Sequence, residues 1–151
     1  MVAIPFLAAL LAGLVAGLYL SGLLHDRRIR DLPGPAYAAM HQMRDYTFRR
    51  VMPVLVLTLL GVLGLAALVA PGWPRWLFLS ALVLFVSDAA HTVRHQRPIN
   101  DLVQSWDAAA PPTGWEGARD SWAQGHGLRL ALGIAAFALT LAAAMIAASA
   151  L

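Results

Sequence analysis

The stretch WLFLSALVLFVSDAAHTVRHQRPIN, residues 76–100, combines the two features that decide how this chain folds. Its first half is an apolar run able to enter a bilayer, and its second half carries Asp88, His91 and His95. Side chains three and four positions apart lie on one face of a helix. The stretch therefore predicts a membrane-spanning helix with a polar, histidine-bearing face at one end.

Further apolar segments accompany this one in a chain of 151 residues, the size of a single domain. The sequence is 60% hydrophobic and only 13% charged, so lipid rather than water is the expected solvent. Because a helix needs about 20 apolar residues to cross a bilayer, we predict an all-α integral membrane four-helix bundle formed by one domain, residues 1–151. The predicted spans are 2–24, 37–70, 75–96 and 126–150, with a polar connection at 98–125 that holds a short helix.

The first apolar segment has a competing interpretation as a cleaved signal peptide. No basic residue precedes it, and His25-Asp26-Arg27-Arg28 follows it in place of an A-x-A cleavage site. We therefore expect the segment to be retained as a membrane span.

Arginines cluster at the first and last predicted connections, whereas Arg75 alone marks the middle turn. The positive-inside rule places these two connections in the cytoplasm and both termini on the non-cytoplasmic side. We expect an integral protein of the bacterial inner membrane, with the lipid bilayer as its surroundings. The arginines flank apolar segments and form no tract with interleaved aromatics, so a nucleic-acid partner is not indicated.

All five histidines fall at the ends of apolar segments that should emerge on the cytoplasmic side. Helical bundles build metal sites from ligands on facing helices, and imidazole suits copper, iron or zinc. We therefore consider a histidine-rich site whose catalytic residues are His41, His91, His95 and Asp88. The candidate metal ligands are His25, His41, His91, His95 and His126. The alternatives are a site without a metal, or ordinary helix ends whose histidines hydrogen-bond to lipid headgroups.

Polar and aromatic residues near this site are candidates for substrate binding. Arg97 and Arg129 could bind an acidic or phenolate group, and Asn100 could supply a polar contact. Trp122 could stack on an aromatic ring. The competing interpretation is that the arginines control topology and that the tryptophan anchors the chain at the membrane interface.

Several enzyme classes have no support in the sequence. The chain lacks cysteine, which excludes disulfides, thiolate nucleophiles and iron–sulfur clusters. It contains no P-loop, nucleophile elbow, Rossmann glycine pattern or HExxH motif. Phosphoryl transfer, serine hydrolysis, nicotinamide binding through that motif and zincin proteolysis are therefore not indicated.

Short motifs along most of the chain are similar to those of one membrane family. They are Ser21–His25, Tyr37–Gln42 leading to Pro53, Arg97–Asn100, and Ser121–Trp122 through His126 to Arg129. In these motifs the chain resembles the DUF1772 family of four-span membrane proteins, also called the anthrone oxygenase family. The resemblance implies oxidation of anthrones to anthraquinones, as in polyketide pathways. The doubled His91 and His95 are not expected of every member and leave open whether this chain shares that activity.

Two functions from different classes follow from these observations. The first is a membrane-bound oxygenase or oxidase whose lipophilic aromatic substrate, anthrone- or quinol-like, enters between the helices. Such an activity does not require a metal, because an electron-rich anthrone enolate can itself reduce oxygen. The alternative is a non-catalytic membrane subunit or scaffold. It would form a homo-oligomer or bind membrane partners through the small residues Gly13, Gly17 and Ser21.

Overall fold

The computed structural model describes residues 3–149, and every regular element within them is helical. The elements are α1 (Ala3–Ile29), α2 (Gly34–Val69), α3 (Trp73–His91), the π-helical turn η1 (Thr92–Gln96), α4 (Arg97–Gln104) and α5 (Trp115–Ser149). Four helical segments are long and apolar enough to cross a membrane, the third of them running through α3, η1 and α4. The predicted all-α membrane bundle is therefore confirmed.

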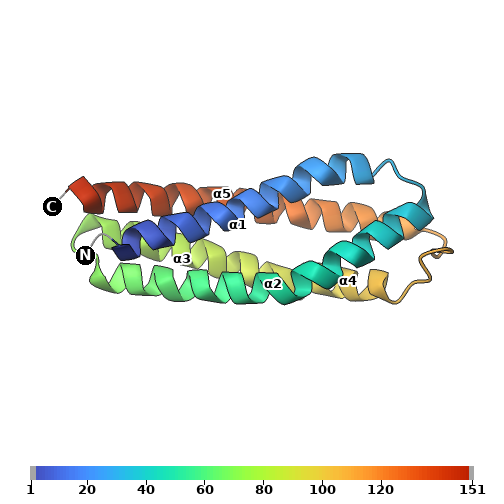
Figure 1. Cartoon of the computed structure of the whole chain (residues 1–151), viewed down its shortest axis with the longest axis horizontal. Coiled ribbons are helices and arrows are strands. Elements are labelled where there is room, and N and C mark those ends of the chain that lie inside the picture. Colours follow the sequence, from blue (N-terminus) through green and yellow to red (C-terminus); the bar gives the residue numbers. More distant parts are fainter. Residues whose placement is uncertain (1–2, 150–151) are drawn as a thin grey trace.

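The helices lie side by side as one elongated bundle (Figure 1). Helix α5 packs against α1 and α3, and α2 packs against the same two helices from the other side. The beginning of α1 and the end of α5 lie at one end of the bundle, and the α1–α2 and α4–α5 loops lie at the other (Figure 1). That the loop end faces the cytoplasm remains a prediction from the charge distribution.

Small, aromatic and some aliphatic side chains fill the interior, and many large apolar side chains lie on the outside. Residues such as Ala8, Leu63, Phe78, Phe85 and Ala136 are fully buried. Many exposed side chains are also apolar, as expected where lipid surrounds the bundle. This distribution leaves polar side chains inside the bundle as the unusual feature that calls for an explanation.

The third membrane-crossing helix continues past the end expected from the sequence. In the π-helical turn, the backbone N–H of Arg97 bonds to the carbonyl of Thr92, five residues earlier. Pro98 follows at the start of α4, where its missing N–H is tolerated. A π-helical turn inserts an extra residue into a helix and shifts the side chains around it. The turn therefore continues the helix beyond residue 96, where the predicted span ends.

The polar connection after this helix is also shorter than the expected 98–125. Helix α4 runs to Gln104, and α5 already begins at Trp115. The first turns of α5 are polar but pack on α2, where the rings of Trp115 and Tyr37 lie 5.1 Å apart. Packing against a neighbouring helix thus extends α5 beyond its apolar part.

Candidate functional site

A cavity of about 520 Å³ lies between the helices, in the half of the bundle nearer the two loops. One wall is apolar and comes mainly from α2, including Met52, Pro53, Val56, Leu57 and Leu60. The opposite side is polar and draws residues from the other helices. These are Tyr19 of α1, Asp88 of α3, Asn100 of α4, and Trp122, His126 and Arg129 of α5.

Three polar side chains form a buried network at one end of the cavity. The Tyr19 hydroxyl donates a hydrogen bond of 2.5 Å to Asp88, whose side chain is 1% exposed. Arg129 donates to Asp88 over 2.9 Å and to the Tyr19 hydroxyl oxygen over 2.8 Å. A carboxylate is stable inside a bundle only when such donors satisfy it. Asp88 therefore fixes the guanidinium of Arg129 at the cavity surface.

A second network joins His41, Asn100 and Trp122. The indole N–H of Trp122 donates to Asn100 Oδ1 over 2.7 Å, which identifies this amide atom as the oxygen. His41 Nε2 lies 3.1 Å from the same oxygen and must therefore be the protonated nitrogen. The hydroxyl of Tyr37 lies 3.3 Å from His41 Nδ1 and donates to it. Both nitrogens of His41 are thus occupied, so this ring positions Asn100 and Trp122.

The ring of His126 lies between Trp122 and α1. It stacks on the indole of Trp122, with 4.9 Å between centroids and an interplanar angle of 11°. Its Nε2 lies 3.0 Å from the backbone carbonyl of Tyr19, an acceptor, so Nε2 carries the proton. Its Nδ1 is then an acceptor when the ring is neutral, and it is buried with no hydrogen-bond partner among the described residues. His126 is the cavity histidine with a lone pair still free for chemistry.

Further arginines line the cavity beside these networks. Arg44 is paired with Asp26 and places its guanidinium 4.4 Å from the centre of the Trp122 ring. Arg49 is paired with Asp45 over 2.7 Å. Arg97 also reaches the cavity, and its side chain makes no ion pair or hydrogen bond with any residue in the range 3–149. The cavity is therefore positively charged along its polar side.

The remaining histidines do not line the cavity. His91 and His95 stack on each other, with their centroids 5.0 Å apart, and His95 Nε2 lies 3.2 Å from the Ser121 carbonyl. His25 is exposed and bonds to the carbonyl of Ser21 in its own helix. Of the five histidines, the structure therefore brings His41 and His126 to the cavity.

A metal centre built from these residues does not fit the described structure. No group of three or more histidine, aspartate or glutamate side chains within residues 3–149 is arranged to hold an ion. The expected ligand set of His25, His41, His91, His95 and His126 is divided between separate places. The roles proposed for these residues do not involve a metal ion.

Several cavity residues were not singled out by the sequence pattern. Tyr19 lies within an apolar run, and its hydroxyl in the first span was the available signal for it. Arg44 resembles a topology-determining charge until its contact with Trp122 is seen. By contrast, Asp88, Asn100, Trp122, Arg97 and Arg129, all predicted as site residues, lie around the same cavity.

Comparison with known proteins gives one result. The family model described as anthrone oxygenase matches residues 40–139, from early in α2 to well into α5. No curated protein and no solved structure matches the chain. The matched range holds His41, Asp88, Asn100, Trp122 and Arg129, and it leaves out Tyr19 on α1.

Proposed function

Because the chain belongs to the anthrone oxygenase family, we propose that it is a membrane-bound oxygenase that oxidises a lipophilic, anthrone- or quinol-like aromatic in the cavity between its helices. The observation that carries the proposal is the two-sided cavity, with an apolar wall on α2 facing a buried, arginine-bearing polar side. Its volume of about 520 Å³ falls within the range of small-molecule sites, roughly 300–1,000 Å³.

The shape of the cavity suits a flat ligand with a single polar edge. Met52, Val56 and Leu60 contact the hydrocarbon rings, while Arg129 faces a phenolic or enolate oxygen. Arg97, which has no partner of its own among the described residues, is a second donor for that oxygen. A guanidinium in a site shielded from water stabilises a developing oxyanion far more than it would in solution.

The reaction needs removal of a proton before oxygen can react. Loss of a methylene proton converts an anthrone to its enolate, which is electron-rich enough to reduce molecular oxygen directly. The overall change, anthrone plus O₂ to anthraquinone plus water, is balanced without another reductant. In this scheme His126 Nδ1 accepts the proton, and Arg129 holds the enolate oxygen. Each group must contact the substrate for the chemistry to occur.

The other polar residues of the cavity act by positioning. Asp88 and Tyr19 orient Arg129, and His41 with Asn100 orients Trp122, on which His126 stacks. Rigid placement of this kind raises the reaction rate strongly, because even a small displacement of a reacting group lowers the rate. We assign no role in the chemistry to His91, His95 or His25.

Oxygen consumption by the purified protein in lipid nanodiscs, with 1,8-dihydroxyanthrone as substrate, tests the proposal. We expect turnover well above the protein-free autoxidation rate, with one atom of ¹⁸O₂ appearing in the quinone product. His126→Gln should lower kcat by at least about 100-fold, the usual contribution of a general base. His25→Gln, on the same side of the bundle but exposed, is the matched control and should keep full activity. A wild-type rate equal to autoxidation would refute the proposal.

A further inference from the structure

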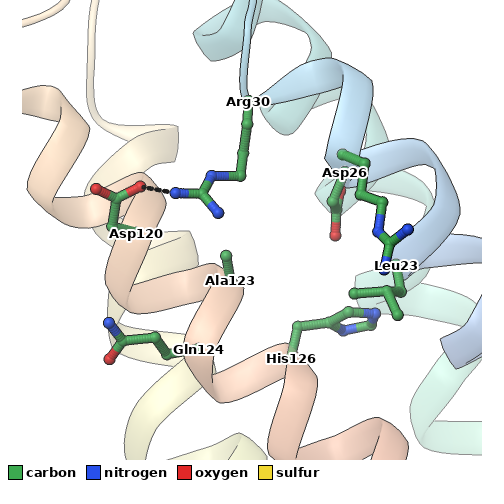
Figure 2. Close-up of a pocket in the computed structure, with 8 residues that line it drawn as sticks. Leu23, Asp26, Arg30, Asp120, Ala123, Gln124 and His126 are labelled. Carbon is green, nitrogen blue, oxygen red and sulfur yellow. Dashed lines mark hydrogen bonds and ion pairs between the residues drawn. The ribbon is translucent and has the colours of Figure 1, made fainter.

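A second cavity, of about 340 Å³, lies between α1 and α5 on the other side of His126. Unlike the first cavity, its lining is rich in charge, including Asp26, Arg27, Arg30 and Asp120. Figure 2 shows Asp26, Arg30 and Asp120 around one hollow, with Arg30 bonded to Asp120 at its rim. Because the side chains of Arg30 and Asp120 are 53% and 43% exposed, this polar cleft is open to water at the loop end of the bundle.

The ring of His126 separates the two cavities, since it lines both of them. Its side chain is 5% exposed, so it forms part of the wall of each cavity and does not project freely into either. Gly22 makes this position possible, because a Cβ there would lie 2.7 Å from His126 Nε2. The imidazole is therefore held between an apolar chamber and a hydrated one.

Asp26 faces His126 across the polar cleft (Figure 2). Its side chain is buried, with the residue 7% exposed, and one oxygen is paired with Arg44. The other oxygen, Oδ2, has no hydrogen-bond partner among residues 3–149. A buried carboxylate oxygen without a donor is costly and calls for an explanation. Asp26 and His126 both line this cleft, and each has one buried polar atom without a partner among the described residues.

We propose that His126 and Asp26 form a proton exit path from the substrate cavity to the polar cleft, an inference that rests on the oxygenase function proposed above. The proton leaves the substrate methylene carbon and binds His126 Nδ1, giving an imidazolium. The imidazolium then releases this Nδ1 proton to the Asp26 carboxylate, which passes it to water in the cleft, while Nε2 keeps its proton on the Tyr19 carbonyl. The substrate keeps the electron pair as its enolate, and His126 returns to the neutral form.

Charges around His126 favour onward transfer. Arg44 on α2 and Arg129 on α5 line the substrate cavity with His126. Arg129 is paired with Asp88, and Arg44, which lies over the Trp122 ring, is paired with Asp26. Arg27 and Arg30 on α1 and Asp120 on α5 line the cleft with Asp26. Two nearby guanidinium groups destabilise an imidazolium by Coulomb repulsion, whereas the Asp26 carboxylate attracts its proton. The direction of transfer is therefore from the apolar cavity toward the cleft.

Asp26→Asn tests the path, and Asp120→Asn is its matched control in the same cleft. Both substitutions replace a carboxylate by its isosteric amide, but Asp120 is exposed and already bonded to Arg119 and Arg30. With 1,8-dihydroxyanthrone in nanodiscs, we expect Asp26→Asn to lower kcat about tenfold or more with little change in KM. Its solvent deuterium isotope effect should rise, because proton release becomes rate-limiting. Asp120→Asn should match the wild type.

Two further measurements separate proton transfer from the structural pairing of Asp26 with Arg44. Asp26→Glu should recover most of the activity, and added acetate should raise the rate of Asp26→Ala by supplying a mobile carboxylate. An unchanged kcat in Asp26→Asn, or a loss that neither the glutamate nor acetate restores, would overturn the exit path while leaving the oxygenase function standing. Absence of turnover in the wild type would overturn the oxygenase function and the exit path together.

Discussion

Gly22 and His126 lie in such close contact that a Cβ at position 22 would be 2.7 Å from the imidazole Nε2. The same nitrogen donates to the Tyr19 carbonyl one turn earlier in α1. A methyl group at position 22 must therefore push the ring away from α1, and the backbone hydrogen bond that fixes its tautomer is lost. This contact leads to the first prediction.

Gly22→Ala should reduce oxygenase activity by about 100-fold, because a displacement of roughly 1 Å at a reacting group has that cost. Gly17→Ala is the control, since a Cβ at position 17 of the same helix meets nothing within 4 Å. It should keep wild-type activity. Equal rates for the two variants, measured by oxygen uptake in nanodiscs, would contradict the placement of His126.

Asp88→Asn should destabilise the bundle by roughly 3–5 kcal/mol, because it leaves the guanidinium of Arg129 largely buried without a counter-charge. Tyr19→Phe removes one neutral donor from the same network and should cost about 1–3 kcal/mol. Ser87→Ala, at an exposed position next in sequence, should change stability by less than about 0.5 kcal/mol. The free energies of unfolding can be compared by following the loss of helicity during titration with SDS in mixed micelles. Any other ranking of the three variants would argue against a buried network.

Trp122→Phe and Trp122→Ala should differ sharply in activity. The phenylalanine keeps an aromatic face for His126 and loses only the hydrogen bond to Asn100, so a few-fold loss of kcat is expected. The alanine removes the surface that supports His126 and Arg44, and a loss of about 100-fold is expected. Trp76→Ala, which alters an exposed ring at the far end of the bundle, serves as control. Similar losses for both changes at position 122 would show that the indole N–H, not the ring stack, is what matters.

Val56→Trp should fill the apolar part of the cavity and block substrate binding. We expect KM to rise beyond measurable concentrations while the protein remains folded. Leu68→Trp, on the same helix at a position 75% exposed and outside the cavity, should have normal kinetics. A normal KM in the cavity variant would mean that the substrate binds elsewhere.

That four helices are long and apolar enough to span a membrane could be predicted from the sequence, because the surrounding lipid limits the alternatives. A run of apolar residues as long as the bilayer is thick has few alternatives to a helix that crosses it. The π-helical turn at Thr92–Gln96 is different, because it depends on tertiary packing, in which His95 and Gln96 lie against Gly125 of α5. Spacing on an ideal helix places Asp88 on the same face as His91 and His95. In the structure, Asp88 lines the cavity, whereas His91 and His95 stack on each other outside it.

The site could be predicted only in part for a related reason. Asn100, Trp122 and Arg129 stand out as polar residues beside apolar segments, and all of them reach the cavity. Tyr19 and Asp26 gain their significance from partners on other helices, Asp88 and Arg44, and no local pattern reveals these partners. The five histidines could form one site only if each ring pointed into the bundle. Position along a helix does not determine that direction.

The cavity wall formed by α2 bears on the route by which a substrate enters. Leu57 lines the cavity and is 68% exposed, and exposed Phe48 lies nearby on the same wall. We therefore expect a compound dissolved in the hydrocarbon layer to enter the chamber sideways, without passing through buffer. Reaction rates should then follow the mole fraction of the compound per lipid, so diluting vesicles with empty ones would slow turnover at constant bulk concentration.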